Sequence, residues 1–263
     1  MKLISLNTWG GNLFEPLISF FEQYKTGIDI FSLQEIWSTA SSKTRQIDIQ
    51  ANLLQEIEKI LLDHVGFFSV TYEGVGHHGT VEDFDLATGN AMFVRKGIKV
   101  LEQGESFIHR TRNSIDTNAH AREDYSTNPR LIQWSLIEDD AGTNTTVFNL
   151  HGMVNATRTK EDTPDRLIQS DNILQALMRF SGRKIVAGDF NLLPNTQSIK
   201  KLEDFGLRNL INEYGITSTR TSHYKKEHRF ADYAFVSRDV LVKEFKVLPE
   251  EVSDHSPLYI EFE

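Results

Sequence analysis

The chain contains no cysteine among its 263 residues, which excludes disulfide bonds, zinc–thiolate sites and cysteine nucleophiles. The absence of disulfides agrees with a reducing compartment, so we expect a cytoplasmic protein. Proline is scarce, with 6 residues, and the composition is not that of a disordered chain. No apolar run approaches the roughly 20 residues of a membrane-spanning helix, and the run 3–6 is too short for a signal peptide. We therefore expect a globular protein without a membrane span.

Positive charge is also in short supply, because 28 lysine and arginine residues face 37 acidic ones and leave a net charge of −9. Nonspecific binding to long polyanions depends on lysine and arginine, so this balance argues against it. Hydrophobic residues make up 39% of the chain, enough to bury a sizeable core. No repeat, low-complexity tract or linker divides the sequence, and sheet folds of this length occur as one unit. We expect a single domain over residues 1–263.

Short apolar runs alternate with longer segments of helical periodicity, which predicts a mixed α and β protein. Strands are expected at 2–7, 28–34, 66–72, 89–95, 98–108, 130–138, 145–151, 183–188, 231–236, 240–248 and 257–262. Helices are expected at about 13–25, 43–63 and 164–180, the last with Thr163 as N-cap and Pro164 in its first turn. The polar stretches 76–89 and 113–128 predict long loops that shape a substrate cleft.

Oxygen-bearing side chains stand where predicted strands end. Asn7 closes the first strand and Glu35 follows the second. Asp189 and Asn191 flank Phe190, so in an extended segment they point to the same side. The alternative is a turn at the strand end, since Asp and Asn both favour turns, but we favour the cleft-facing arrangement. Because Mg²⁺ prefers carboxylate and amide oxygens, the pattern predicts a magnesium site, with Mn²⁺ as a substitute.

Two histidines and their neighbours complete a candidate catalytic set. His255 can exchange a proton near neutral pH, and Asp232 could orient its ring. Asp254 stands directly beside it. His151 ends an apolar run, where it could protonate a leaving oxygen or bind phosphate, although a loop carbonyl could also satisfy it. Arg130 heads another predicted strand and could neutralise phosphate charge, unless its side chain extends to solvent.

These residues fall in blocks that resemble the endonuclease/exonuclease/phosphatase (DNase I-like) superfamily over nearly the whole chain. The superfamily includes pancreatic deoxyribonuclease, abasic-site endonucleases, tyrosyl-DNA phosphodiesterases, inositol polyphosphate phosphatases and bacterial sphingomyelinases. The resemblance implies an α+β fold, a four-layer αββα sandwich of two mixed sheets, and magnesium-dependent cleavage of a phosphoester. The matching blocks, in the family's order, are Asn7-Thr8-Trp9, Leu33-Gln34-Glu35, Asn149-Leu150-His151, Gly188-Asp189-Phe190-Asn191, Ala231-Asp232-Tyr233 and Ser253-Asp254-His255.

The resemblance also implies a role for each oxygen-bearing residue. Glu35 would bind the metal with help from Asn7, and Asp189 would orient or activate the attacking water. Asn191 would hold the phosphate, and Asp254 would assist the metal or the water. These roles describe a metal-assisted attack of water in line with the leaving oxygen.

For the histidines, the resemblance implies that His255, oriented by Asp232, acts as the base or stabilises the phosphorane. His151 is similar to the histidine of the deoxyribonuclease and sphingomyelinase branches, which points away from abasic-site repair. Two departures fall where family members contact substrate. Gly-Met-Val follows His151, and the block 219–221 reads Thr-Arg-Thr. The substrate class therefore stays open.

Three functions compete for this chain. The leading hypothesis is a phosphodiesterase or nuclease acting on DNA or RNA ends or short strands, because a negative chain suits small or terminal substrates. The second is a phosphomonoesterase or lipid-headgroup hydrolase acting on inositol phosphates or sphingomyelin. A non-catalytic scaffold is disfavoured, since every expected polar position is filled.

The basic stretch 220–229, with Tyr224, could bind nucleic acid or be a solvated loop, and Trp9 and Trp37 could line the cleft or join the core. No protein partner is implied.

Overall fold

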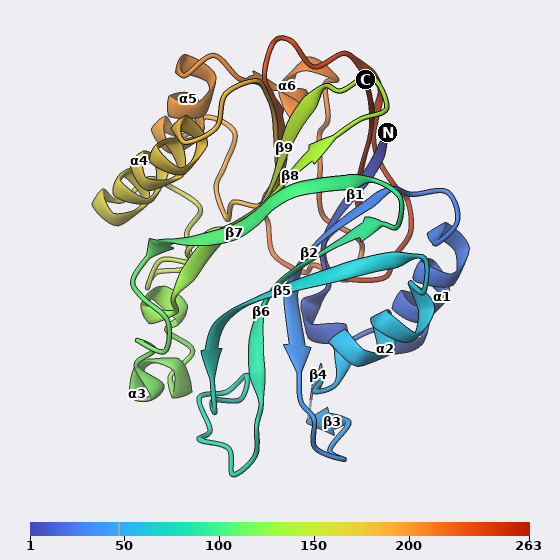
Figure 1. Ribbon diagram of the computed structural model, residues 1–263. Coiled ribbons are helices and arrows are strands. Elements are labelled where there is room, and N and C mark those ends of the chain that lie inside the picture. The colour runs from blue at the N-terminus through green and yellow to red at the C-terminus, as the bar shows by residue number, and fades with distance from the viewer. Residues whose placement is uncertain (47) are drawn as a thin grey trace.

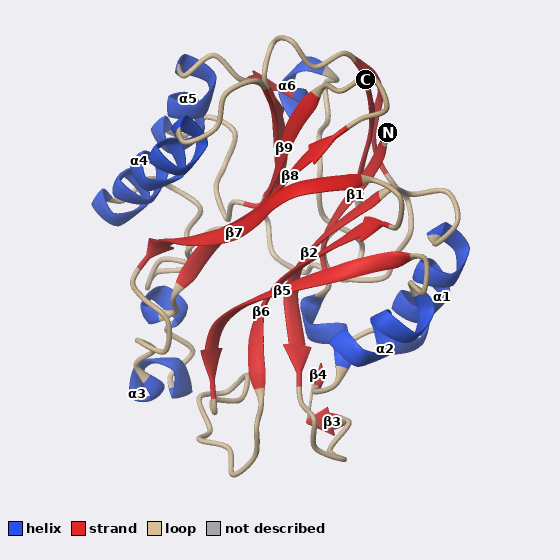
Figure 2. Ribbon diagram, viewed as in Figure 1, coloured by secondary structure: helices blue, strands red, loops and turns tan. Residues whose placement is uncertain are grey.

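The computed structural model describes residues 1–46 and 48–263 and shows two mixed six-stranded sheets packed face to face (Figures 1 and 2). Helices lie on the outer face of each sheet, so the predicted four-layer αββα sandwich is confirmed. The first sheet has the order β13 (Val242–Val247), β14 (Leu258–Phe262), β1 (Lys2–Asn7), β2 (Ile30–Ser38), β6 (Ala87–Arg95), β5 (His64–Glu73). The second has the order β11 (Arg208–Asn209), β12 (Asp232–Val236), β10 (Arg183–Asp189), β9 (Asn144–His151), β8 (Arg130–Glu138), β7 (Lys99–His109).

Each sheet contains one central parallel pair with antiparallel strands on both sides. In the first sheet β1 runs parallel to β2, with Asn7 opposite Gln34. In the second sheet β10 runs parallel to β9, with Asp189 opposite His151, and antiparallel to β12, with Asp189 opposite Asp232. Because parallel strands end at the same edge of a sheet, this register gathers the polar residues of each sheet at one edge.

The outer helices bury one face against the sheets. Helices α1 (Phe14–Tyr24) and α2 (Leu53–Ile60) lie beside the first sheet, and α4 (Pro164–Met178) and α5 (Gln197–Asp204) lie beside the second (Figure 1). The hydroxyl of Thr163 accepts a hydrogen bond from the Arg166 N–H, so the predicted N-cap of α4 is confirmed. Shorter elements are η1 (Trp9–Gly11), β3 (Arg45–Gln46), β4 (Ile49–Gln50), α3 (Thr117–Ala121), η2 (Tyr125–Thr127) and α6 (Leu210–Glu213).

One predicted helix is wrong over its first half. The expected helix 43–63 is present only as α2, and the preceding segment forms the two-stranded β3–β4 sheet. Residue 47 lies outside the described residues. Tertiary packing decided this outcome, because Ile49 and Ala51 are buried in a small apolar cluster with Trp37. Helix α5 was not predicted, although Thr196 accepts a hydrogen bond from the Ile199 N–H and is an ordinary N-cap signal.

All eleven predicted strands are present, with ends that differ by a few residues from those expected. The predicted loop 113–128 contains α3 and η2, and β6 begins at Ala87 inside the predicted loop 76–89. The main apolar core lies between the sheets and under α4, and a second core joins the first sheet to α1 and α2. Among the helices of the described residues, none has the length and apolar character needed to cross a lipid bilayer.

Candidate active site

Side chains from both sheets meet where β1 and β10 end. The Asn7 amide donates hydrogen bonds to Glu35 Oε1 at 3.0 Å and to Asp189 Oδ2 at 3.1 Å. Asn7 and Asp189 are almost fully buried, whereas the Glu35 side chain is 31% exposed. Asn7 therefore couples a carboxylate of the first sheet to one of the second.

A buried polar network holds the two sheets in register beneath these residues. The Gln34 amide donates to Asn149 Oδ1 at 2.7 Å, which joins β2 to β9. The Asn149 amide donates in return to the carbonyls of Leu33 and Ala91 and to Gln133 Oε1, all within 3.1 Å. Buried hydrogen-bond networks of this kind rigidify a core and favour one arrangement of the groups above them.

The backbone is distorted at two of the candidate residues. Glu35 has φ of +57° at an irregularity in the β2–β6 register, and Asn191 has φ of +55°. Such conformations cost about 1–3 kcal/mol for residues other than glycine and gather at functional sites. The Asn191 N–H donates to Asp189 Oδ1 at 2.8 Å, and its side-chain amide donates to Asp189 Oδ2 and the Gly152 carbonyl. Asn191 thus fixes the position of the Asp189 carboxylate.

The spacing between β9 and β10 depends on Gly188, the residue before Asp189. A Cβ atom there would collide with the carbonyl oxygen of Leu150 on the neighbouring strand. Only glycine permits this close approach. His151 and Asp189, which follow these two residues, are opposite each other in the parallel register.

Asp232 and His255 form a buried pair next to Asp189. His255 Nδ1 lies 2.9 Å from both carboxylate oxygens of Asp232. The other ring nitrogen, Nε2, lies 3.6 Å from Asp189 Oδ2 and 3.7 Å from Asp254 Oδ1. The predicted orienting partner is therefore in contact with the predicted base.

Burial sets the charge states of this pair. It raises the pKa of Asp232 to about 6, and burial together with Arg220 lowers the pKa of His255 to about 4. At neutral pH Asp232 is then ionised and His255 is neutral. The Nδ1–H group donates to the carboxylate, which leaves the Nε2 lone pair free to accept a proton.

His151 and Arg130 flank the carboxylates from the second sheet. His151 Nε2 lies 3.8 Å from Glu35 Oε1 and 3.8 Å from Asp189 Oδ2. Burial and the nearby charge of Arg130 hold the His151 pKa well below its usual value, so the ring is neutral. Arg130 is only 8% exposed, and its Nε has no hydrogen-bond partner among the described residues. Arg130 thus lines the cleft instead of extending to solvent.

Two cationic residues of the site were not predicted as such. The sequence singles out Arg220 only within the block 219–221 and the basic stretch 220–229. Its Nη1 donates to Asp254 Oδ2 at 2.8 Å, and its guanidinium lies 4.2 Å from the centre of the Tyr224 ring. Lys160 stands in a loop without a motif. Its ammonium donates to the Phe230 carbonyl at 2.7 Å, and burial, with Arg220 nearby, lowers its pKa to about 8. Both residues line the cleft.

One cleft, with a volume of about 240 Å³, is lined by Glu35, Arg130, His151, Lys160, Asp189, Asn191, Arg220, Asp254 and His255. Asn7 and Asp232 do not belong to the lining but are in hydrogen-bond contact with Glu35 and His255, respectively. The lining combines the carboxylates and imidazoles with cationic, aromatic and uncharged polar residues. Trp9 and Trp37 both belong to this lining, and Trp37 is also 3% exposed within an apolar cluster. The other aromatic side chains of the lining are Tyr72, Tyr125 and Tyr224.

The carboxylate oxygens in the cleft are suitable ligands for a hard divalent cation. Asp254 Oδ1 is buried and has no hydrogen-bond partner among the described residues, so it is an acceptor that a cation or its water would satisfy. Glu35 offers a second, partly exposed carboxylate in the same cleft. The oxygen of Asn7 accepts from the Trp9 N–H at 3.0 Å, and its nitrogen faces the carboxylates. Asn7 thus orients Glu35 in the structure shown.

The fold is similar to several solved structures, each matched over the whole chain. The mannosyl-6-phosphatase of Bacteroides thetaiotaomicron is 17% identical, with a TM-score of 0.70 and 99% of that structure covered. An endonuclease/exonuclease/phosphatase family protein from Leptotrichia buccalis is 21% identical, with a TM-score of 0.71 and 99% covered. The human Nocturnin catalytic domain, which has a bound sulfate anion, is 18% identical, with a TM-score of 0.68 and 93% covered. No curated protein sequence matches the chain.

A family model described as "Endonuclease/Exonuclease/phosphatase family" matches residues 4–255. The match extends from the first strand to His255 and includes every residue predicted for the site. The enzymes in the family's name all hydrolyse phosphoester bonds, which agrees with a cleft that combines carboxylates, imidazoles and buried cations. The chain belongs to the Endonuclease/Exonuclease/phosphatase family.

Proposed function

We propose that this protein is a Mg²⁺-dependent phosphoesterase, and specifically a phosphodiesterase or nuclease that acts on DNA or RNA ends or short strands. The observation that carries the proposal is the meeting of Glu35, Asp189 and His255 in one cleft, with Asp232 in contact with His255 Nδ1. We further propose that residues 1–263 work as one domain.

Glu35 and Asp254 are the residues that would hold the metal, with Asn7 orienting Glu35. When bound, a divalent cation neutralises the charge that develops on the phosphate and the leaving oxygen. Mn²⁺ accepts similar oxygen ligands and should substitute for Mg²⁺.

The chain's own residues position the attacking water. Asp189 Oδ2 and the free Nε2 of His255 are both acceptors and lie 3.6 Å apart. A water molecule that donates to both would be fixed and made more nucleophilic. As the water attacks, its proton passes to His255 Nε2, and Asp232 stabilises the resulting imidazolium.

Three further groups would stabilise the phosphate. Arg130 and Lys160 are buried cations of the cleft wall, and buried cations attract developing negative charge more strongly than exposed ones. His151, which lies within 4 Å of Glu35 and Asp189, would donate a hydrogen bond to the phosphate or to the leaving oxygen. Asn191 supports this arrangement by holding the Asp189 carboxylate.

The size and lining of the cleft support a compact substrate. A volume of about 240 Å³ suits a terminal nucleotide better than a long duplex. Tyr125 and Tyr224 offer rings on which a base could stack. The net charge of −9 also disfavours a long polyanion.

One observation favours a second candidate, a phosphomonoesterase or lipid-headgroup hydrolase. Arg130, Lys160 and Arg220 place three cations in the cleft wall, and a phosphate monoester carries one more negative charge than a diester. The structurally similar mannosyl-6-phosphatase acts, as its name says, on a phosphorylated sugar. The aromatic lining would accept a sugar or inositol ring as readily as a base.

A substrate panel distinguishes these candidates. We expect Mg²⁺-stimulated hydrolysis of bis-p-nitrophenyl phosphate and of labelled oligonucleotide ends, and none after chelation of metal. Hydrolysis of p-nitrophenyl phosphate and hexose 6-phosphates alone would establish the second candidate instead. Absence of hydrolysis across the panel with Mg²⁺ and Mn²⁺ would refute both and favour a binding scaffold. The Asp189→Asn variant controls for contaminating phosphatases.

A further inference from the structure

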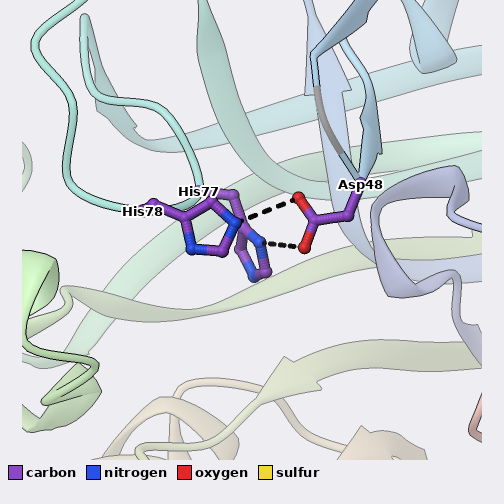
Figure 3. Close-up of side chains that lie close together, drawn as sticks. All are labelled: Asp48, His77 and His78. Carbon is purple, nitrogen blue, oxygen red and sulfur yellow. Dashed lines mark hydrogen bonds and ion pairs between the residues drawn. The ribbon is translucent and has the colours of Figure 1, made fainter.

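A second group of metal-binding side chains lies outside the carboxylate site. Figure 3 shows His77 and His78 facing the same carboxylate, that of Asp48. His77 Nδ1 lies 2.9 Å from Asp48 Oδ2, and His78 Nε2 lies 3.5 Å from Asp48 Oδ1. One ligand atom from each of the three residues lies within 4.8 Å of the others.

The three residues come from two separate loops. Asp48 stands in the turn between β3 and β4, and the histidines stand at the tip of the loop between β5 and β6. The loop tip is a tight turn, in which the Gly79 N–H donates to the Gly76 carbonyl. A Cβ atom on Gly79, which has φ of +76°, would lie 2.7 Å from the backbone nitrogen of Ala121. The turn is thus held against α3.

Contacts with residues other than Asp48 hold His77 in place. Its backbone carbonyl accepts a hydrogen bond from His120 Nε2 at 2.6 Å. Its ring is stacked on Tyr125, with an interplanar angle of 8° and centroids 6.2 Å apart. The ring therefore presents Nδ1 to Asp48 without needing to rearrange, which lowers the entropic cost of binding an ion.

The chemistry of the three ligands differs from that of the carboxylate site. Two imidazoles and one carboxylate form a set that Zn²⁺ and similar transition metals prefer, whereas Mg²⁺ prefers oxygen ligands alone. The side chains are 30–43% exposed, and they border a pocket of about 330 Å³ that leaves room for water as a further ligand.

We propose that Asp48, His77 and His78 form a Zn²⁺ site that joins the β3–β4 turn to the β5–β6 loop. The alternative is a set of hydrogen bonds to one carboxylate, which would need no metal. His77 also lines the catalytic cleft, so the ion would fix one wall of that cleft. The proposal does not depend on the proposed phosphoesterase activity.

Calorimetric titration of the purified full chain with Zn²⁺ tests the site. The titration uses the Glu35→Gln variant, which lacks a carboxylate of the catalytic cleft, so that binding there is weakened. We expect one equivalent of Zn²⁺ to bind, and Asp48→Asn or His78→Ala in the same background to lose it. X-ray absorption at the zinc edge should show two imidazole ligands in the loaded protein.

The matched control is Asp83→Asn, which removes the exposed ion pair between Asp83 of the β5–β6 loop and Lys43 of the β2–β3 connection. It should retain the full equivalent of Zn²⁺, and circular dichroism should show that every variant is folded. Failure of the Glu35→Gln protein to bind Zn²⁺ would overturn the proposal. Unchanged stoichiometry after Asp48→Asn or His78→Ala would do so equally.

Discussion

The molecule contains two clusters of titratable side chains, one buried and one partly exposed. We call Asp189, Asp232 and His255 the buried centre, and Asp48, His77 and His78 the exposed rim. Asp189, Asp232 and His255 are all at most 4% exposed, and two sheets position them. Asp48 and His77 lie on loops, with side chains 30% exposed. The comparison shows two ways of positioning side chains. Strands that end at the same edge of a sheet hold their side chains rigidly together, even when they are far apart in the sequence. Loops need additional contacts before their side chains are held in place.

The buried centre should show the largest response to a single change. Asp189→Asn keeps the shape of the side chain and removes its negative charge. We expect kcat/KM for bis-p-nitrophenyl phosphate to fall by about a thousandfold, because the water loses an anionic acceptor. Asp204→Asn, on an exposed helical carboxylate, is the control and should leave the rate unchanged. A comparable kcat/KM in both variants would show that Asp189 takes no part in catalysis.

A smaller loss should follow when the partner of His255 is changed. Asp232→Asn removes the charge that stabilises the imidazolium, and we expect about a hundredfold decrease in kcat/KM. In the wild-type protein the rate should fall as the pH drops below about 6, where Asp232 becomes protonated. The Asp232→Asn variant should not show this decrease in rate below about pH 6. If the variant showed the same decrease, another group would be responsible for it.

Acid should destabilise the fold through its buried and half-buried histidines. Their pKa values are lowered in the folded state, so below the ordinary histidine pKa of 6.5 the unfolded chain binds more protons than the folded one. The free energy of unfolding therefore decreases as the pH is lowered. Asp232, with a raised pKa, opposes this in part. We expect a loss of about 2 kcal/mol in unfolding free energy between pH 7 and pH 6, measured in urea. The histidines concerned are His64, His109, His120, His151 and His255.

One variant tests that interpretation directly. His64→Gln retains a donor for the Ile28 carbonyl, which His64 Nε2 contacts at 2.9 Å, but cannot titrate in this range. Its stability should depend less steeply on pH than that of the wild-type protein. An identical pH dependence would show that His64 carries none of the effect.

The smallest expected effect is at the rim. Gly79→Ala would place a methyl group 2.8 Å from the Thr117 carbonyl oxygen, and we expect a loss of about 1–2 kcal/mol in unfolding free energy. Gly142→Ala is a matched control with the same φ of +76° and no neighbouring atom within 4 Å. The difference between the two variants isolates the contact with α3, and Zn²⁺ should bind more weakly only to Gly79→Ala.

The sequence predicted the sheets far better than the smaller elements. Strands with continuous apolar runs, such as residues 185–187 of the predicted strand 183–188, could be placed because both faces of that run are buried. The segment 43–52 could not, because Ile49 is held in β4 by burial against residues distant in sequence. Local propensity carries no information on such contacts.

Within the site, the ordered blocks predicted which residues meet, and the structure places them in or next to one cleft. Their individual roles stay predictions. Lys160 could not be foreseen, because its importance comes from burial near Arg220 and not from any local pattern. The adjacent His77 and His78 were a visible signal, but their partner Asp48 is 29 residues away from His77 and belongs to a segment that was predicted as helix.

The close approach of β9 and β10 has a consequence for how this protein can change. The separation of His151 from Asp189 is set by a hydrogen atom at position 188, where any larger substituent would meet the Leu150 carbonyl. Adding a single methyl group there would wedge the strands apart directly below both reactive groups. Attempts to re-engineer the enzyme should therefore vary the cleft wall and leave Gly188 unchanged.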